Sequence, residues 1–202
     1  MVAMLAAQGS LWDAEEEPRF DADFTRATRT DLGHGAWLET VPGWVSGADA
    51  LLDAVIAAAP WAGHERWMYD RVVSEPRLST RGWDSAPDPV PSMTTVLGRR
   101  YGLCLDAISA NLYRDGRDSV ALHGDTAGRR VATTVVAIVV LGAPRRFLLR
   151  PRDGGPTRRL APGHGDLLVM GGTCQRTWEH AVPKCAATGV RVALMFREPG
   201  VF

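Results

Sequence analysis

The chain has 202 residues, of which 46% are hydrophobic and 23% are charged, and its formal net charge at neutral pH is zero. This length and composition are ordinary for a soluble globular protein with one well-buried domain. No apolar run approaches the roughly 18–20 residues that a helix needs to span a bilayer, so we expect no membrane partner. The three cysteines include no CxxC pair. They predict neither a disulfide framework nor a zinc knuckle and favour a reducing, cytoplasmic location.

Charge is distributed unevenly along the chain. Residues 1–60 carry 10 acidic and 3 basic side chains, whereas the remainder has a basic excess made almost wholly of arginine. Arginine binds phosphate and carboxylate groups through planar bidentate contacts, and a basic body is compatible with a polyanionic partner. A solvated arginine-rich surface is nevertheless the more common cause of such a composition. Charge alone therefore does not establish a nucleic-acid partner.

The first half of the sequence predicts an arm followed by two helices. Residues 1–30 contain few large apolar side chains, and we expect them to form an acidic arm that is flexible or loosely docked. A capping box of Ser46 and Asp49 predicts a helix that starts near Ser46 and continues at helical spacing to Ala59. A second helix is expected over Ser92–Tyr101.

The segment between these helices is rich in proline. Residues 76–91 contain four prolines together with two arginines and a tryptophan. Such a stretch cannot be a central strand, so we expect an irregular surface segment of the kind that often carries recognition. The sequence therefore predicts a recognition segment at about residues 65–100.

From about residue 108 the pattern changes to short β-like runs separated by Gly, Pro and Asp. Val131–Leu141 is almost wholly small and β-branched, which is typical of a buried strand. Further runs follow at 147–150, 166–170 and 190–196. Several short strands with turn signals between them predict a mostly β fold with flanking helices, either a β-sandwich or a jelly roll.

Alternation along a strand brings polar side chains to one face in three places. The three pairs are Asn111 with Tyr113, His123 with Asp125, and Arg191 with Arg197. An arginine at each end of an otherwise apolar strand is costly unless it meets an anion. A His-x-Asp unit with a distant histidine supplies the two-histidine, one-carboxylate set of non-haem Fe(II) oxygenases, which leaves coordination positions open.

The distant histidine is not identified by the residues alone. His-x-Asp units occur by chance in many surface turns, and two later histidines compete to complete the set. His164 lies in a turn before a strand, and His180 lies eleven residues before Arg191. Composition does not decide between them.

Taken together, these motifs resemble the signature of the AlkB family of Fe(II)- and 2-oxoglutarate-dependent nucleic-acid dealkylating dioxygenases. The string NLYRDGRDSV over 111–120 is similar to that of bacterial members, as is GDLLVMGG over 165–172 running into Trp178-Glu179-His180. Weaker similarity extends upstream, so that the resemblance covers roughly residues 30–198. The joint order and spacing of four motifs makes it specific.

The resemblance implies a double-stranded β-helix, or jelly roll, as a single dioxygenase domain over residues 31–202. It implies that Fe(II) is held by His123, Asp125 and His180, because family members carry the glycine-rich strand before the distal histidine. His164 is then a turn residue.

The resemblance also assigns cosubstrate contacts. Arg191 would pair with the far carboxylate of 2-oxoglutarate through a charge-assisted bidentate contact. Asn111 and Tyr113 would hydrogen-bond the cosubstrate, and Arg197 would lie nearer the iron, where O2 also binds.

The activity implied is oxidative dealkylation of N-alkylated bases, such as 1-methyladenine and 3-methylcytosine, as DNA repair. Single-stranded DNA and a monomeric enzyme are expected, since no element that could open a duplex is evident. An RNA or tRNA demethylase with the same chemistry is the first alternative. A nucleic-acid-binding family member with little turnover is the second.

Substrate contacts are expected from the recognition segment and from a basic hairpin. The candidate substrate-binding residues are Trp67, Arg77, Arg81 and Trp83. Trp67 or Trp83 would stack on the base. Arginines spread over 145–159 could follow a phosphate backbone.

The sequence departs from the family at two places. The strand positions between the two arginines hold Ala193 and Met195 instead of polar residues, which predicts a less polar cosubstrate pocket. The stretch 126–129, just after the motif aspartate, lacks the acidic residue that favours cationic bases, so we expect a shallow preference for them.

Overall fold

The computed structural model describes residues 16–68, 70–124, 130–186 and 188–200. Within these ranges the strands form an eight-stranded sheet (the major sheet), a four-stranded sheet (the minor sheet) and a two-stranded ribbon. The major sheet has the order β2(Thr28–Gly33), β3(Ala36–Val41), β12(Leu167–Gly172), β9(Val136–Gly142), β14(Arg191–Arg197), β7(Ala107–Tyr113), β6(Arg71–Arg81) and β5(Ala62–Met68). The minor sheet has the order β11(Arg158–Leu160), β10(Phe147–Pro151), β13(Trp178–Val182) and β8(Val120–His123).

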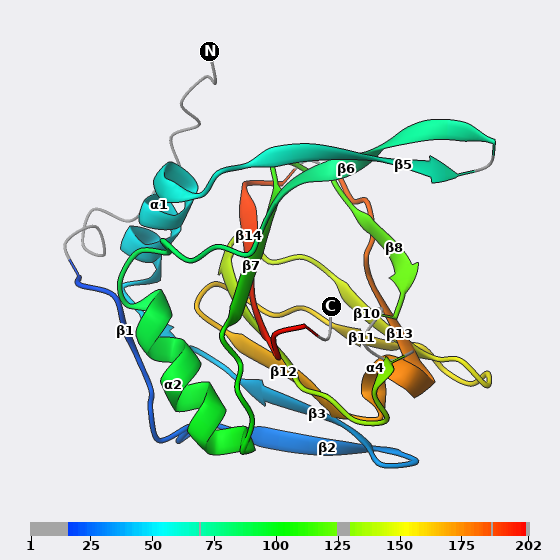
Figure 1. Cartoon of the computed structure of the whole chain (residues 1–202), viewed down its shortest axis with the longest axis horizontal. Coiled ribbons are helices and arrows are strands. Elements are labelled where there is room, and N and C mark those ends of the chain that lie inside the picture. The colour runs from blue at the N-terminus through cyan, green and yellow to red at the C-terminus, as the bar shows by residue number, and fades with distance from the viewer. Residues whose placement is uncertain (1–15, 69, 125–129, 187, 201–202) are drawn as a thin grey trace.

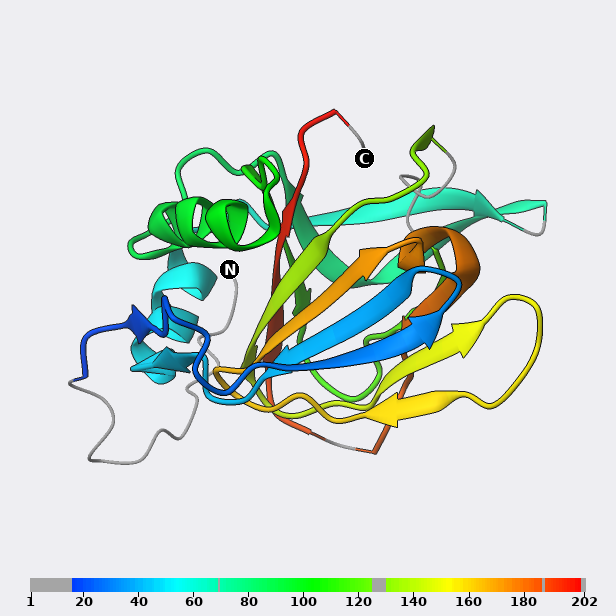
Figure 2. The ribbon, with the colours of Figure 1, turned by 90° about the horizontal axis from the view of Figure 1, so that it is seen from below.

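The major sheet is covered on both faces. Helices α1(Ala48–Ala58) and α2(Val90–Tyr101) lie on one side of it and the minor sheet lies on the other (Figures 1 and 2). Alternate residues of β9 therefore enter two separate cores: Val139 packs with the helices, and Ile138 packs between the sheets. Burial on both faces explains the continuous apolar run in this strand. This arrangement confirms the predicted mostly β jelly roll with flanking helices.

The N-terminal segment differs from the predicted flexible arm over residues 16–30. Strand β1(Arg19–Phe20) pairs with β4(Val45–Ser46), and β2 forms the edge of the major sheet. Phe20 and Phe24 lie 5.2 and 5.8 Å from Trp44, measured between ring centroids. Two phenylalanines suffice to dock this segment because Trp44 is itself buried in the helix-side core. Residues 1–15 lie outside the described ranges.

Two local predictions also need correction. Helix α1 has Gly47 at its N-cap, in the left-handed region, and no side-chain cap, so Ser46 and Asp49 form no capping box. Residues 76–81 belong to β6 instead of an irregular segment. Strand β6 tolerates Pro76 because its register against β5 shifts there, and its pairing with β7 starts only at Leu78. The second helix begins at Val90, close to the expected start.

A buried carboxylate holds the N-terminal strands to α2. Glu39 on β3 is 2% exposed and accepts hydrogen bonds from Arg29, Arg100 and Tyr101 at 2.9, 2.9 and 2.7 Å. Burial alone would raise the pKa of Glu39, but the bonds from Arg100 and Tyr101 outweigh it and lower the pKa.

No helix in the described part of the chain combines the length and apolar character needed to cross a bilayer.

Glu39→Gln should lower the free energy of unfolding by about 2 kcal/mol at neutral pH, because an amide loses the charge-assisted bonds. The partly solvated guanidinium groups keep this below the cost of breaking a fully buried pair. Since the folded pKa is lowered, the contribution is present above the ordinary glutamate pKa and is lost as pH falls through the folded pKa. Urea unfolding of both proteins from pH 7 down to pH 3 checks this. A wild-type advantage that does not shrink as the pH falls below the ordinary glutamate pKa would contradict it.

Candidate active site

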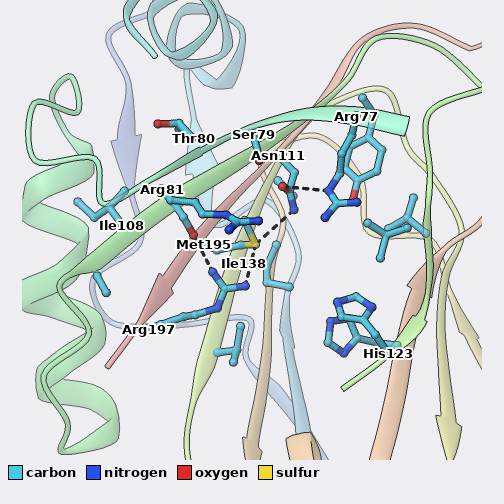
Figure 3. A pocket seen from close by; sticks show the side chains of 18 of the residues that line it. Arg77, Ser79, Thr80, Arg81, Ile108, Asn111, His123, Ile138, Met195 and Arg197 are labelled. Carbon is cyan, nitrogen blue, oxygen red and sulfur yellow. Dashed lines mark hydrogen bonds between the residues drawn. The ribbon is translucent and has the colours of Figure 1, made fainter. Parts of the chain in front are cut away.

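A cavity of about 510 Å³ lies between the two sheets. Its polar walls come from β6, β7 and β14 of the major sheet and from β8 and β13 of the minor sheet. Figure 3 shows Asn111, Met195 and Arg197 along one side of this cavity and His123 on the other. The sequence-predicted residues that line it are Arg77, Arg81, Asn111, Tyr113, His123, His180, Arg191 and Arg197.

Two histidines face each other across neighbouring strands of the minor sheet. His123 on β8 pairs in register with His180 on β13, and their ring centroids are 4.3 Å apart. Phe147 stacks on His180 at 5.7 Å and restricts its ring. Nδ1 of His123 donates to the carbonyl of Ala121 at 2.9 Å, since a carbonyl can only accept. Because Nδ1 is engaged in this way, Nε2 is the His123 nitrogen that would ligate a metal.

The backbone at Gly124 passes close to two residues outside its own strand, Arg152 just after β10 and Gln175 just before β13. A Cβ atom at Gly124 would collide with the Arg152 guanidinium and would lie 2.8 Å from the carbonyl oxygen of Gln175. Arg152 in turn pairs with Glu179 at 3.2 Å. Glycine is therefore required at this point of the His-x-Asp unit by close approach. Asp125 and the stretch 126–129 lie outside the described residues.

Arg191 is a buried cation and is the first residue of β14. Its side chain is 1% exposed, and its Nε and Nη1 have no hydrogen-bond partner among the described residues. The guanidinium lies over the ring of Tyr113, 5.0 Å from the centroid. Burial lowers the pKa of Arg191, although Tyr113 opposes the shift. No ion pair to Arg191 is found within the described ranges, so the cavity presents an uncompensated positive charge suited to an anion.

Asn111 and Arg197 already have partners in the cavity. The Asn111 carbonyl accepts from Arg77 at 3.3 Å, and its amide donates to the Met195 sulfur at 3.7 Å. Arg197 donates to Ser109 at 2.6 Å and to the Met195 sulfur at 3.1 Å. Met195 thus acts as a weak acceptor at a position where the family resemblance implies a polar residue.

Three sequence-based assignments fall outside this cavity. Trp83 is 2% exposed in the helix-side core, so the prediction that it stacks on a base is wrong. Trp67 is 70% exposed on β5, away from the cavity lining. His164 lies 3.2 Å from Asp49 and accepts from the backbone N–H of Gly142, and it is not part of the cavity lining.

The arginines over 145–159 are also less available to a phosphate backbone than the sequence indicates. Arg145 is 3% exposed and buried among loops, and Arg150 and Arg152 both pair with Glu179. Their neighbours Arg158 and Arg159 remain exposed on β11. Local sequence reasoning missed this because every one of these arginines lies in a turn-rich, polar stretch.

Sequence reasoning also missed two residues that order the cavity. Phe147 packs on His180, and Glu75 pairs with Arg77 at 2.8 Å. Glu75 could have been found, because Glu75 and Arg77 are two residues apart on one strand and share a face. Phe147 could not, since its contact with His180 depends on the pairing of β10 with β13.

The family model described as the 2OG-Fe(II) oxygenase superfamily matches residues 46–197. Similar curated proteins include alpha-ketoglutarate-dependent dioxygenase alkB homolog 3 of Rattus norvegicus, 31% identical over 61% of this chain and 43% of its own length. The Homo sapiens protein of the same name is 30% identical over 68% and 49%. DNA oxidative demethylase ALKBH2 of Arabidopsis thaliana is 31% identical over 62% and 48%. The chain thus spans about half the length of these relatives.

Solved structures agree on the fold. A prolyl hydroxylase from Trichoplax adhaerens superposes with a TM-score of 0.60 at 12% identity, covering 80% of this chain and 83% of that one. The structure of OsALKBH1 superposes with a TM-score of 0.56 at 14% identity, covering 85% and 100%. At such low identity the likeness concerns the fold alone.

Arg191→Met should make the ligand-free protein more stable by about 1–2 kcal/mol, because an apolar side chain of similar size removes an unpaired buried charge. Thermal or urea unfolding without ligands measures this. Arg158→Met, at an exposed position, serves as the control and should change stability by no more than about 0.5 kcal/mol. Marked destabilisation by Arg191→Met would show that the folded protein already neutralises this charge.

Proposed function

This chain belongs to the 2OG-Fe(II) oxygenase superfamily, and we propose that it removes alkyl groups from bases of single-stranded DNA by oxidation. The superfamily uses Fe(II), 2-oxoglutarate and O2, and the 30–31% identity to AlkB homologues confirms the resemblance to the AlkB family. One observation carries the proposal: a buried, uncompensated Arg191 shares a cavity with the facing pair His123 and His180.

The histidine pair fits a metal by the chemistry of its donors. His123 and His180 are adjacent imidazoles, and the bond from His123 to Ala121 directs one nitrogen toward a metal. We assign Fe(II) to His123, His180 and Asp125, the last through its place in the His-x-Asp unit. When bound, the iron supplies the oxidation of the alkyl carbon with O2 and 2-oxoglutarate.

The opposite wall of the cavity fits a dicarboxylate. The Nε and Nη1 atoms of Arg191 have no partner among the described residues, and Arg191 would pair with the far carboxylate of 2-oxoglutarate, a pairing in which planar geometry adds to charge. Arg197 and Asn111 line the same cavity and would hydrogen-bond the nearer end, with Tyr113 beside Arg191.

The lining also has apolar members, which would help to keep water from the reacting carbon. Its apolar members include Val136, Ile138, Phe147, Val182 and Ala193. An alkylated base inserted here would meet hydrocarbon on the minor-sheet side and Arg77 and Arg81 near β6. Exclusion of water and fixed orientation are what this chain contributes to the reaction.

Nucleic acid would bind outside the cavity, where the β5–β6 hairpin projects from the major sheet (Figure 1). Trp67 and Val72 are cross-strand partners on this hairpin and are 70% and 56% exposed. An exposed tryptophan offers a platform on which unpaired bases stack. This surface supports single-stranded DNA as the substrate.

The test is succinate and formaldehyde release with matched DNA and RNA oligonucleotides that carry 3-methylcytosine or 1-methyladenine. We expect turnover on DNA that His180→Ala abolishes together with iron binding. His164→Ala is the matched control and should keep both turnover and iron binding, because His164 does not line the cavity. Turnover on RNA and not on DNA would replace single-stranded DNA by RNA as the substrate. Iron binding by the wild type without any succinate release would overturn the proposal.

Trp67→Ala should raise the KM for single-stranded oligonucleotides by about tenfold, since base stacking contributes roughly 1–3 kcal/mol per base. Trp67→Phe should retain most of the affinity because it keeps an aromatic face. The KM for 2-oxoglutarate and the melting temperature should stay unchanged in both variants, as Trp67 is exposed. Equal oligonucleotide KM values for wild type and Trp67→Ala would remove this residue from the substrate surface.

A further inference from the structure

Arg145 is a second buried arginine near the cavity, and it does not face solvent. It lies between β9 and β10 and is 3% exposed. Its Nη1 donates to the carbonyl of Asp115 at 3.0 Å, and its Nη2 donates to those of Asp118 and Pro183 at 2.9 and 2.8 Å. Its Nε has no hydrogen-bond partner in the described part of the chain.

These bonds hold the guanidinium without neutralising it. All three acceptors are backbone carbonyls, which carry no net charge. The carboxylates of Asp115 and Asp118 are instead engaged by Arg117 and Arg114, at 2.7 Å in each case. No ion pair to Arg145 occurs within the described residues, so its charge resembles that of Arg191 in being buried and uncompensated.

The two arginines lie over the same aromatic ring. The Arg145 guanidinium carbon is 5.8 Å from the Tyr113 centroid, and that of Arg191 is 5.0 Å from it. After burial, which is the largest cause, repulsion from Arg145 further lowers the pKa of Arg191. Two buried charges of one sign thus lie beside Tyr113 at one end of the cavity.

Arg145 cannot relieve this repulsion by moving. Its three acceptors belong to the turn after β7 and to the residue after β13, the strands that carry Tyr113 and His180. The same three bonds therefore fix the charge in place and join two loops that border the site. An anion entering the cavity is the remaining means of compensating the pair.

We propose that Arg145 is a specificity-determining residue, whose buried charge makes the cavity select a 2-oxo acid with a negatively charged tail over one with an uncharged tail. It acts through space across Tyr113, whereas Arg191 contacts the tail directly. The inference rests on the proposed 2-oxoglutarate site.

The experiment compares two ligands by calorimetric titration of the Mn(II)-loaded protein: 2-oxoglutarate, and 2-oxopentanoate, in which a methyl group replaces the far carboxylate. The variants are Arg145→Gln, which removes the charge, and Arg145→Lys, which keeps it. Arg146→Gln is the matched control, since Arg146 is the exposed next residue.

Arg145→Gln should reduce the preference for 2-oxoglutarate by about tenfold, as expected for one buried charge acting at an effective dielectric constant of about 20. Arg145→Lys should retain most of the preference, and Arg146→Gln should match the wild type.

If both Arg145 variants bind both ligands more weakly and by the same factor, Arg145 only joins the loops, and the proposal would fail. An unchanged preference in folded Arg145→Gln would also overturn it. If Arg145→Gln does not fold, loss of the preference in Arg145→Lys contradicts the proposal by itself. Failure of the wild type to bind Mn(II) or 2-oxoglutarate would instead reject the proposed function.

Discussion

The buried charge of Arg191 is the constraint around which the cavity is organised. Strand β14 lies between β9 and β7 in the interior of the major sheet, and its other face packs into the helix-side core. An arginine at its start therefore has no route to solvent and is 1% exposed. Burial of an unpaired guanidinium costs several kcal/mol. The fold accepts this cost at Arg191, which is consistent with a ligand that supplies the missing negative charge.

The two sheets divide the chemistry between them. The major sheet contributes the cationic wall, through β7 and β14, whereas the minor sheet contributes the histidine pair through β8 and β13. The separation between the sheets is set by the apolar core around Ile138, Met170 and Trp178. The residues proposed for charge recognition and for metal ligation thus lie on opposite walls, and the volume between them depends on ordinary apolar packing.

Local patterns predicted what depends on alternation along one strand and failed where distant loops decide burial. The shared face of Arg191 and Arg197, and the mostly β fold, follow from period-two spacing. The burial of Arg145 does not, because its acceptors lie up to 38 residues away in sequence. Trp83 was misjudged for a similar reason: a proline-rich setting indicates an exposed loop, but this loop folds its tryptophan under α2.

The arginine content of residues 61–202 overstates the number of cationic groups that a polyanion could contact. Arg150 and Arg152 are both paired with Glu179, and Arg152 also packs against Gly124 beside His123. Both charges are therefore engaged by Glu179 on β13, the strand that carries His180. A phosphate backbone competing for them would disturb the histidine pair. The proposed binding of nucleic acid would accordingly rely on exposed groups such as Arg158 and Arg159, and on stacking, which does not weaken with salt as phosphate contacts do.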